Sequence, residues 1–367
     1  MDKKFHIETN LVQSGNKEDP RTGAVSAPIH MSTAFRHEGL GESTGFDYSR
    51  TGNPTRDILE RAIAGLENGA KGYALSSGMA AIQTLFAIFD KDDEILASQD
   101  LYGGTYRLFE EGWKNWGITI AYGDPRNVEA FEQKITERTK ALFIETPTNP
   151  LMQEADISEM SKLAKKHGLW LIVDNTFYTP ILQRPLDMGA DIVIHSASKY
   201  LGGHNDIIAG LIVTKDEQLS SRITAFHNGM GTILSPMDSW LLMRGMKTLS
   251  LRMEKHTENA RAVAEFLDTH PKVTDVLYTG KGGMLSFRIE NEQWVDSLLR
   301  GLDLITFAES LGGVESFMTY PATQTHADVP EEVRIANGVC NRLLRFSVGI
   351  ENKEDIIADL GQALDRL

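Results

Sequence analysis

The sequence predicts an α/β fold, with a mostly parallel sheet in a large domain and a smaller C-terminal α+β domain. Between residues 70 and 215, short apolar runs alternate with amphipathic segments, as expected for strands that alternate with helices. Several of these runs are apolar throughout, which is typical of strands covered by helices on both faces. After residue 215 the alternation stops, and a long helical stretch precedes mixed strands and helices.

The composition is that of an ordinary globular protein. The 367 residues are enough for two domains, and 41% are hydrophobic and 24% charged. The net charge of −14 argues against a nucleic-acid partner, because nucleic-acid phosphates are also negative. Cys340 is the only cysteine, which excludes an internal disulfide and fits a reducing cytoplasm. We find no signal peptide and no run of 18 apolar residues, so we expect no membrane association.

The first 47 residues contain many glycines and prolines and few periodic apolar positions, so we expect irregular structure there. Such a segment is either disordered or an arm that packs on something else, such as a neighbouring subunit. We therefore divide the chain into an arm (1–47), a first domain (48–240) and a C-terminal domain (241–367).

The loop after the arm offers groups that suit a phosphate. Arg50 can grip a phosphate in bidentate fashion and Tyr48 can donate a hydrogen bond to it, although an ordinary loop before a helix would look the same. Thr55 is expected to cap a helix over residues 56–66, where apolar side chains recur at helical spacing.

A second phosphate-binding candidate lies at residues 73–81, which read as a strand, a turn of small residues and a helix start. Free N–H groups at a helix N-terminus suit a phosphate, and Gly78 would allow it to approach closely. The same pattern also describes a plain strand-to-helix connection.

Two further strands lead to groups that suit a flat, polar ligand. The strand at 93–98 leads to Tyr102, which can stack on a planar ring or simply pack at the edge of the core. The strand at 141–145 leads to Asn149, which is either a turn former or a polar contact to a ligand. An amphipathic helix is expected at 157–167.

Two buried strands carry an acid and an amine at their ends. One ends in Asp174, and the other, at 192–194, is followed by Ser196, Ser198 and Lys199. Open α/β sheets bind ligands at the carboxyl ends of their strands. A partly desolvated lysine favours the neutral amine, which can form a Schiff base with an aldehyde, and the two serines could hold an anion beside it.

Each residue of this pair also has an ordinary explanation, because most lysines are solvated and many aspartates cap helices or form turns. Together, however, they supply what pyridoxal phosphate (PLP) needs. A lysine can form a Schiff base with its aldehyde, and an aspartate can pair with its pyridinium nitrogen.

The C-terminal domain is expected to mix helices and strands. In it, Arg345 is a lone charge in an alternating strand, where it would meet a carboxylate, either of a ligand or of a structural salt bridge. The expected elements are helices within 241–267, at 294–299 and at 354–364, and strands at 283–289 and 344–348.

Seven motifs in sequence order carry a family resemblance over nearly the whole chain. They are YSRTGNPT (48–55), SSGMAA (76–81), YGG (102–104), ETPTNP (145–150), VDNT (173–176), HSASKY (195–200) and RFSVG (345–349). In these the chain resembles the Cys/Met-metabolism family of PLP-dependent enzymes, the group of cystathionine γ-synthases and γ-lyases.

The resemblance implies a fold-type-I PLP-dependent transferase that forms a homotetramer, with active sites shared between two subunits. Lys199 matches the Schiff-base lysine, Asp174 the partner of the pyridinium nitrogen, and Tyr102 the stacking ring, and these three would be the catalytic residues. The other matched cofactor-binding residues are Gly78, Met79, Ser196 and Ser198 around the phosphate, Tyr48 and Arg50 from the neighbouring subunit, and Thr176.

The resemblance also implies a substrate site. Asn149, Ser310 and Arg345 match groups that hold the substrate's α-carboxylate, and Arg107 could bind a second carboxylate or be a helix-surface arginine. Glu309 is similar to the glutamate of γ-synthases and γ-lyases, whereas Gly104 stands where methionine γ-lyases have cysteine. No metal site is assigned.

Residues 46–50 and 106–109 look more like bacterial γ-synthases. The resemblance therefore implies γ-replacement on an O-acylhomoserine with cysteine, which gives cystathionine for methionine biosynthesis by transsulfuration, or with sulfide, which gives homocysteine. The alternative is a cystathionine γ-lyase, which shares the same site residues.

Two other classes are a PLP-binding regulatory protein and a cofactor-free binding protein. The complete set of Lys199, Asp174, Tyr102 and Arg345 argues against the regulatory protein. A cofactor-free protein would lack the absorbance of bound PLP. The acyl group and the preferred thiol stay open.

Overall fold

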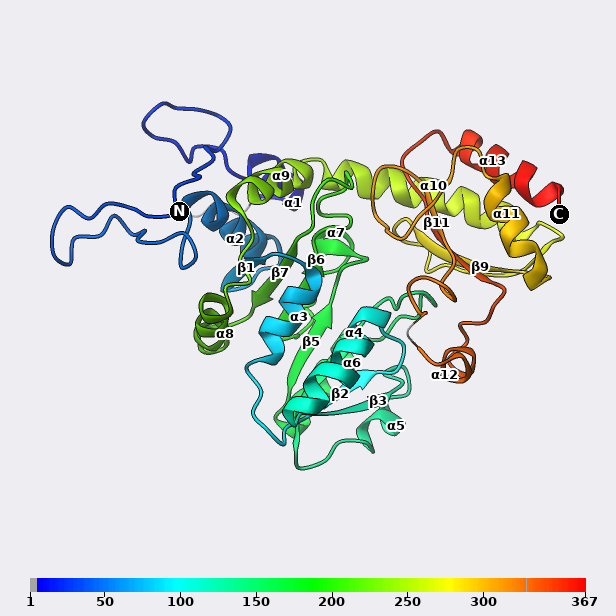
Figure 1. Ribbon diagram of the computed structural model, residues 1–367, viewed down its shortest axis with the longest axis horizontal. Helices are drawn as coiled ribbons and strands as arrows, with labels where there is room; N and C mark the ends of the chain where they lie inside the picture. Colours follow the sequence, from blue (N-terminus) through cyan, green and yellow to red (C-terminus); the bar gives the residue numbers. More distant parts are fainter. Residues whose placement is uncertain (1–4, 328) are drawn as a thin grey trace. The chain divides into compact units, whose positions relative to one another are not determined.

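The computed structural model describes residues 5–327 and 329–367, which divide into two compact units (Figure 1). The first unit is the described part of Met1–Asp90 together with Thr179–Ser250, and the second is Lys91–Tyr178 together with Leu251–Leu367. No helix in these described stretches has the length and apolar character that crossing a membrane requires.

The first unit contains three antiparallel strands in the order β1-β7-β6. Helix α3 packs against β6 and β7, and α2 packs against β1 and α9. The elements are α1 (Ile7–Gln13), α2 (Pro54–Leu66), β1 (Lys71–Leu75), α3 (Gly78–Phe86), α7 (Thr179–Leu182), β6 (Ile192–Ser196), β7 (Gly210–Thr214), α8 (Glu217–Met230) and α9 (Pro236–Met246).

The second unit begins with four parallel strands in the order β5-β4-β2-β3. Their central residues, such as Phe143 and Ile172, are fully buried. The elements are β2 (Glu94–Ser98), α4 (Gly103–Arg107), the π-helical turn η1 (Leu108–Gly112), the 3₁₀ turn η2 (Trp113–Trp116), β3 (Thr119–Gly123), α5 (Val128–Glu132), β4 (Thr139–Glu145), α6 (Ile157–His167) and β5 (Trp170–Asp174).

The rest of the second unit is built around a five-stranded sheet in the order β10-β11-β12-β9-β8. Apolar side chains of α10, α11 and α13 form one buried cluster with this sheet. The elements are α10 (Leu249–Asp268), β8 (Val273–Leu277), β9 (Met284–Ile289), η3 (Glu292–Trp294), α11 (Val295–Gly301), β10 (Thr306–Phe307), β11 (Phe317–Thr319), α12 (Glu331–Ala336), β12 (Leu343–Ser347) and α13 (Lys353–Asp365).

The predicted fold class, an α/β fold with a mostly parallel large sheet and a second smaller sheet, is confirmed. Strand β7 departs from the parallel pattern, because it runs antiparallel to both β1 and β6. The connection from β6 to β7, residues 197–209, contains no crossover helix, and a return without such a crossover gives an antiparallel pair.

The predicted cap of the first domain's opening helix was wrong by two residues. Helix α2 starts at Pro54, and the side chain of Asn53 accepts hydrogen bonds from the backbone N–H groups of Thr55 and Arg56. Proline suits the first helical position, and asparagine is among the preferred caps. The Thr55 hydroxyl instead donates to the carbonyl of Pro28 and accepts from the N–H of His30 (both 2.9 Å), which fastens the arm to α2.

The arm is less irregular than predicted. It contains α1, which the sequence analysis missed because only Leu11 of this seven-residue helix is buried and no periodic apolar face marks it. The Lys247 ammonium donates to the carbonyls of Val12 and Ser14 at the end of α1 (2.7 and 2.6 Å). Cations stabilise a helix at this end. The predicted boundaries near residues 47 and 240 stay predictions.

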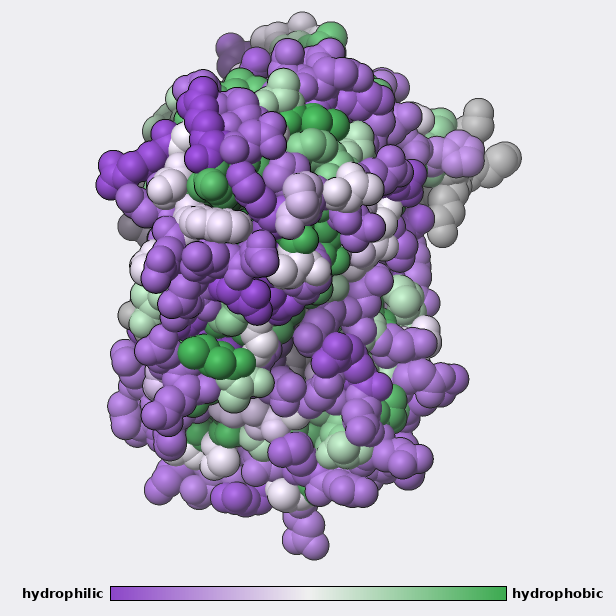
Figure 2. Space-filling model, turned by 90° about the vertical axis from the view of Figure 1, so that its right-hand side faces the viewer, coloured by the Kyte–Doolittle hydropathy of each residue, from purple (hydrophilic) through white to green (hydrophobic). Residues whose placement is uncertain are grey.

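Hydrophilic side chains predominate on the face shown in Figure 2, and hydrophobic ones occur there in small separate groups.

Asp359 of α13 fastens the loop that leads to β10. Its carboxylate accepts the backbone N–H groups of Asp303, Leu304 and Ile305 at 2.8, 3.0 and 2.8 Å. Burial raises the pKa of Asp359, but the three N–H groups outweigh burial and hold this pKa below its ordinary value.

The change Asp359→Asn should therefore lower the free energy of unfolding by about 1.5–3 kcal/mol at neutral pH, because one amide oxygen cannot serve all three donors. Asp355→Asn, on an exposed position of the same helix, is the control and should change it by less than about 0.5 kcal/mol. Because the folded pKa is depressed, the carboxylate's contribution is present above about pH 4 and is lost as the pH falls through the folded pKa. Urea unfolding at neutral and acidic pH measures both effects, and a loss that did not shrink in acid would contradict this assignment.

Candidate active site

In the first unit, the start of α3 lies against the end of β6. Gly78 is the first residue of α3 and Met79 the second, and the Ser77 hydroxyl caps the helix by accepting the N–H of Ala80 at 3.0 Å. A Cβ on Gly78 would lie 2.9 Å from the Cβ of Ser196, so only glycine permits this approach. The first N–H groups of a helix have no partner within the helix and are suited to bind an anion.

The first residue of β7 makes an even closer approach to the same turn. A Cβ on Gly210 would lie 2.0 Å from the carbonyl oxygen of Ser77 and 2.9 Å from the nitrogen of Gly78. Because Gly210 is also the register partner of Ser196, the ends of both strands and the start of α3 meet at one point.

Lys199 lies in a tight turn directly after β6, and its side chain is half-buried. Its backbone N–H donates to the carbonyl of Ser196 at 3.3 Å, and its carbonyl accepts the N–H of Gly203 at 2.8 Å. The Ser198 hydroxyl accepts the N–H of Ala209 at 2.9 Å. The turn thus fixes the backbone of Lys199 close to the serines that the sequence analysis assigned to the phosphate.

Tyr48 and Arg50 are exposed in this single chain. The guanidinium of Arg50 lies over the ring of Tyr48, 5.8 Å from its centroid, and donates to the side chain of Asn228 at 2.9 Å. Their predicted contact with the phosphate of a neighbouring subunit stays a prediction.

In the second unit, two carboxyl groups stand next to each other at the ends of parallel strands. Asp174 ends β5 and Glu145 ends β4, and they are register partners. The backbone N–H and the hydroxyl of Thr176 both donate to one oxygen of Asp174, at 3.0 and 2.6 Å. The Asp174 carboxylate is therefore oriented by a residue that the sequence analysis placed in the cofactor site.

Glu145 binds the backbone of two predicted site residues. One of its oxygens accepts the N–H of Tyr102 at 3.0 Å, and the other accepts the N–H of Asn149 at 2.9 Å. Burial, followed by the nearby charge of Asp174, raises the pKa of Glu145 well above its ordinary value. The raised pKa reflects the cost of burying the Glu145 carboxyl beside the partly buried carboxyl of Asp174.

Arg345 lies on β12 with only 2% of its surface exposed. Its guanidinium donates to the side-chain oxygen of Asn149, to the carbonyl of Ser310 and to the hydroxyl of Thr319, all at 3.0 Å. These three partners are neutral acceptors, and an arginine guanidinium suits the carboxylate of an amino acid. The structure thereby brings together the three residues predicted to bind the α-carboxylate.

Tyr102 precedes α4 and is 37% exposed. Burial of its hydroxyl raises the pKa of Tyr102, the charge of Glu309 raises it further, and the charges of Arg107 and Arg345 act in the opposite direction. These predicted substrate-binding side chains therefore lie near enough to Tyr102 for their charges to act on its hydroxyl. A Cβ on Gly104 would lie 2.5 Å from the ring, so a larger residue there would move Tyr102.

The donor set fits PLP group by group. The first unit supplies the N-terminus of α3 and serine hydroxyls for a phosphate, in a cradle that a Cβ on Gly78 would fill, and the Lys199 amine for an aldehyde. The second unit supplies an oriented carboxylate at Asp174 for a pyridinium nitrogen and an exposed ring at Tyr102 for stacking.

Two residues of this region were not predicted as part of the site. Glu145 carries the same signal as Asp174, an acid at the end of a buried strand, and that signal could have found it. Thr319 lies on the short strand β11 and reaches Arg345 only through the pairing of β11 with β12, which no local pattern reveals.

Known proteins resemble the whole chain. The family described as Cys/Met metabolism PLP-dependent enzyme matches residues 8–365. A cystathionine γ-synthase/O-acetylhomoserine (thiol)-lyase of Bacillus subtilis is 65% identical over 98% of this chain and 96% of its own. A cystathionine γ-synthase of Haemophilus influenzae is 60% identical over 100% of both chains, and a cystathionine γ-lyase of Bacillus subtilis is 46% identical over 98% and 99%.

Among solved structures, a cystathionine γ-synthase from Xanthomonas oryzae pv. oryzae, in complex with aminoacrylate and cysteine, is 40% identical to this chain with a TM-score of 0.97. The match covers 99% of each of the two chains. From these matches, the chain belongs to the Cys/Met-metabolism family of PLP-dependent enzymes.

Proposed function

We propose that this protein joins cysteine to an O-acylhomoserine by γ-replacement, releasing a carboxylate and forming cystathionine. The observation that carries the proposal is the ranking of its relatives, because two γ-synthases are 65% and 60% identical whereas a γ-lyase is 46% identical. The cluster of Arg345, Asn149 and Ser310 supports it, since it suits the α-carboxylate of an amino acid.

Bound PLP supplies an aldehyde that links to an amine and a ring that draws electrons away from the substrate's Cα. Asp174 would accept a hydrogen bond from the ring nitrogen of bound PLP and so favour the protonated form of that nitrogen. Thr176 holds the carboxylate in position for this role. Arg345 binds the substrate's α-carboxylate, and Asn149 orients the guanidinium.

Lys199 acts as the base. Its Nζ atom would take the proton from Cα. Once Nζ has handed that proton on, Lys199, or Tyr102 in its place, would help to take a proton from Cβ, after which the Cγ–O bond breaks and the acyl group departs as a carboxylate. The sulfur of cysteine then forms a bond to Cγ, the thiol proton is released, and one proton returns to each of Cβ and Cα. Because the pKa of Tyr102 is raised, its hydroxyl is protonated in the free site and is a hydrogen-bond donor there. Each general acid–base step contributes about 10²–10⁴-fold.

Sulfide is a second acceptor, in which case the product is homocysteine. The name of the Bacillus subtilis relative, which includes O-acetylhomoserine (thiol)-lyase, favours this addition. The γ-lyase alternative finds its support in the relative at 46% identity.

We further propose a cytoplasmic homotetramer with active sites shared between two subunits. Apolar side chains exposed on the arm support a partner surface, because Val25, Met31 and Leu40 are 75%, 68% and 105% exposed. Tyr48 and Arg50, on the same exposed stretch, would then reach the phosphate of the neighbouring subunit.

A product assay on PLP-loaded protein tests the function. O-acetylhomoserine and O-succinylhomoserine are each offered with cysteine or sulfide, and cystathionine is offered alone. We expect cystathionine from one acyl donor with cysteine. Rapid release of cysteine and 2-oxobutanoate from cystathionine, without a replacement product, would overturn the proposal in favour of the γ-lyase.

The change Lys199→Ala should lower kcat by at least about 10⁴-fold, because the base is lost from two proton transfers. It should also abolish the visible absorbance of lysine-linked PLP. Lys215→Ala, on a partly exposed lysine that follows β7, is the matched control and should retain both properties. A Lys199→Ala protein that kept the linked absorbance would refute the assignment.

The change Gly210→Ala should weaken PLP binding by about tenfold or more, equivalent to about 1.4 kcal/mol, because a Cβ would collide with the Ser77 carbonyl at the start of α3. Gly229→Ala on α8 is the control, since a Cβ there meets no atom within 4 Å. Titration of the apo proteins with PLP gives the dissociation constants, and thermal unfolding of both variants checks that they are folded. Equal PLP affinity in the two folded variants would contradict the proposed phosphate site.

A further inference from the structure

We infer that Glu145 is a positioning residue that holds the ring of Tyr102 and the side chain of Asn149 in fixed positions relative to each other. The inference rests on the proposed function, because it takes Tyr102 as a catalytic ring and Asn149 as part of the carboxylate site.

The geometry is that of one side chain joining two loops. Tyr102 follows β2 and Asn149 follows β4, and these neighbouring parallel strands release their loops at the same edge. Glu145 accepts the N–H of Tyr102 on one oxygen at 3.0 Å and the N–H of Asn149 on the other at 2.9 Å. A shift of either peptide group therefore strains the other through a single carboxyl.

The side chains of Tyr102 and Asn149, whose N–H groups Glu145 binds, both belong to the proposed site. The side-chain oxygen of Asn149 accepts a hydrogen bond from Arg345 at 3.0 Å, so Glu145 helps to set the direction of the guanidinium. The ring of Tyr102 begins three bonds beyond the backbone nitrogen that Glu145 holds, and Glu309 and Arg107 lie close enough to influence its hydroxyl. One carboxyl thus acts on a proposed binding group and on a proposed catalytic group.

A glutamate at this position carries an electrostatic cost, because its carboxyl group is buried near another carboxyl group. Glu145 is buried opposite Asp174, and burial together with that charge raises its pKa. Glutamine would have the same shape without this electrostatic penalty. However, an amide has one acceptor oxygen, and its NH₂ group would face one of the two N–H donors. Holding both N–H groups at once requires two acceptor oxygens, and a carboxyl group has them.

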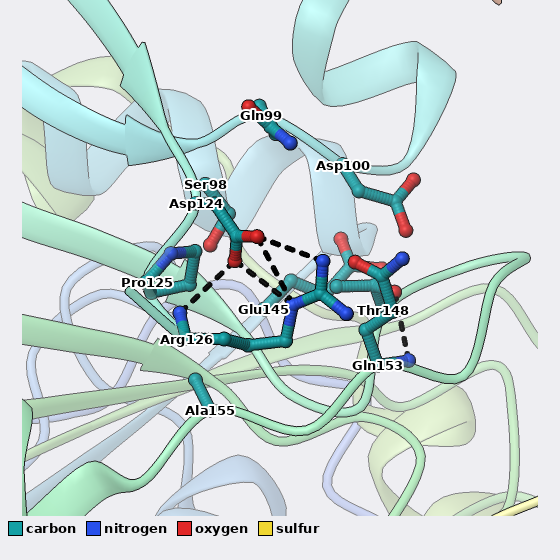
Figure 3. Close-up of a pocket in the computed structure, with 10 residues that line it drawn as sticks. All are labelled: Ser98, Gln99, Asp100, Asp124, Pro125, Arg126, Glu145, Thr148, Gln153 and Ala155. Atoms are coloured by element: carbon teal, nitrogen blue, oxygen red, sulfur yellow. Dashed lines mark hydrogen bonds and ion pairs between the residues drawn. The ribbon is translucent and has the colours of Figure 1, made fainter. Parts of the chain in front are cut away.

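Glu145 also lines a small cavity together with Ser98, Asp100, Thr148 and the Asp124–Arg126 ion pair (Figure 3). The cavity volume is about 10 Å³, which leaves room for about one water molecule and is far too small for a substrate. This cavity therefore gives Glu145 no contact with a substrate, and its effect on the site passes through the two N–H groups that it binds.

The experiment compares Glu145→Gln with Glu94→Gln. Glu94 is a matched control, because it is 5% exposed, begins β2 at the opposite end of the strand and accepts hydroxyl hydrogen bonds from Thr136 and Thr139 at 2.9 and 2.7 Å. Steady-state kinetics with an O-acylhomoserine and circular dichroism of bound PLP are measured for both variants and the unchanged protein.

We expect Glu145→Gln to raise KM, because Asn149 and Arg345 lose alignment, and to lower kcat, because the Tyr102 ring shifts. The combined loss in kcat/KM should be about 10²-fold, typical of a displacement of about 1 Å. The circular dichroism of bound PLP should also change, since it reports the ring stacked on the cofactor. Glu94→Gln should lose stability to a similar extent and leave KM and the dichroism unchanged.

Glu145→Gln with an unchanged KM and an unchanged dichroism would overturn the inference, as would equal changes in both variants. Glu145→Asp, which keeps the acid but is one methylene too short to reach both donors, is the second variant and should show the same pattern. If neither variant folds, hydrogen exchange of the unchanged protein decides, because the amides of Tyr102 and Asn149 should exchange slowly. Fast exchange at both would overturn the inference.

Failure of the proposed function would look different. In that case the unchanged protein would form no replacement product from any O-acylhomoserine. The dichroism of the variants needs no substrate, so it would still test the role of Glu145 towards Tyr102.

Discussion

A carboxyl group that is wholly or partly withdrawn from water at the end of a parallel strand needs hydrogen-bond donors, and two such groups connect the site residues of the second unit. Asp174 takes its donors from Thr176, just beyond its own strand. Glu145 takes them from the backbone of Tyr102 and Asn149 in two different loops. Through Asn149 the arrangement extends to Arg345 and the C-terminal sheet. The positions of Thr176, Tyr102 and Asn149 are thus tied to the hydrogen bonds that these two acids accept.

The first unit solves a different problem, which is to bring backbone N–H groups close to an anion. Side chains would keep α3 away from the ends of β6 and β7, and glycine at positions 78 and 210 removes that obstacle. The hydroxyl of Ser77 caps the helix, and the turn after β6 presents Lys199 beside the same point. The two glycines therefore shape this part of the site by leaving room for the close approach of the backbone.

The sequence predicted residues whose role depends on local pattern. Asp174 and Lys199 stand out because each follows an apolar run at a strand end, and helix α6 was found with its observed bounds because its apolar face is regular. Features that depend on pairing between distant segments were not predicted. Strand β7 is antiparallel because of how the chain returns after β6, and Thr319 joins Arg345 only through the C-terminal sheet. The family resemblance was confirmed by the relatives, whereas the roles of the individual site residues stay proposals.

The bond between Asn149 and Arg345 joins positions 196 residues apart in the chain. At synthesis rates of about 5–20 residues per second, roughly 10–40 s separate the emergence of the two partners from the ribosome. During that interval the parallel strands of the second unit exist without the sheet that supplies Arg345, Ser310 and Thr319. The carboxylate-binding cluster is therefore among the last parts of the protein to be assembled, and a nascent chain cannot hold an amino acid there until the C-terminal sheet has formed.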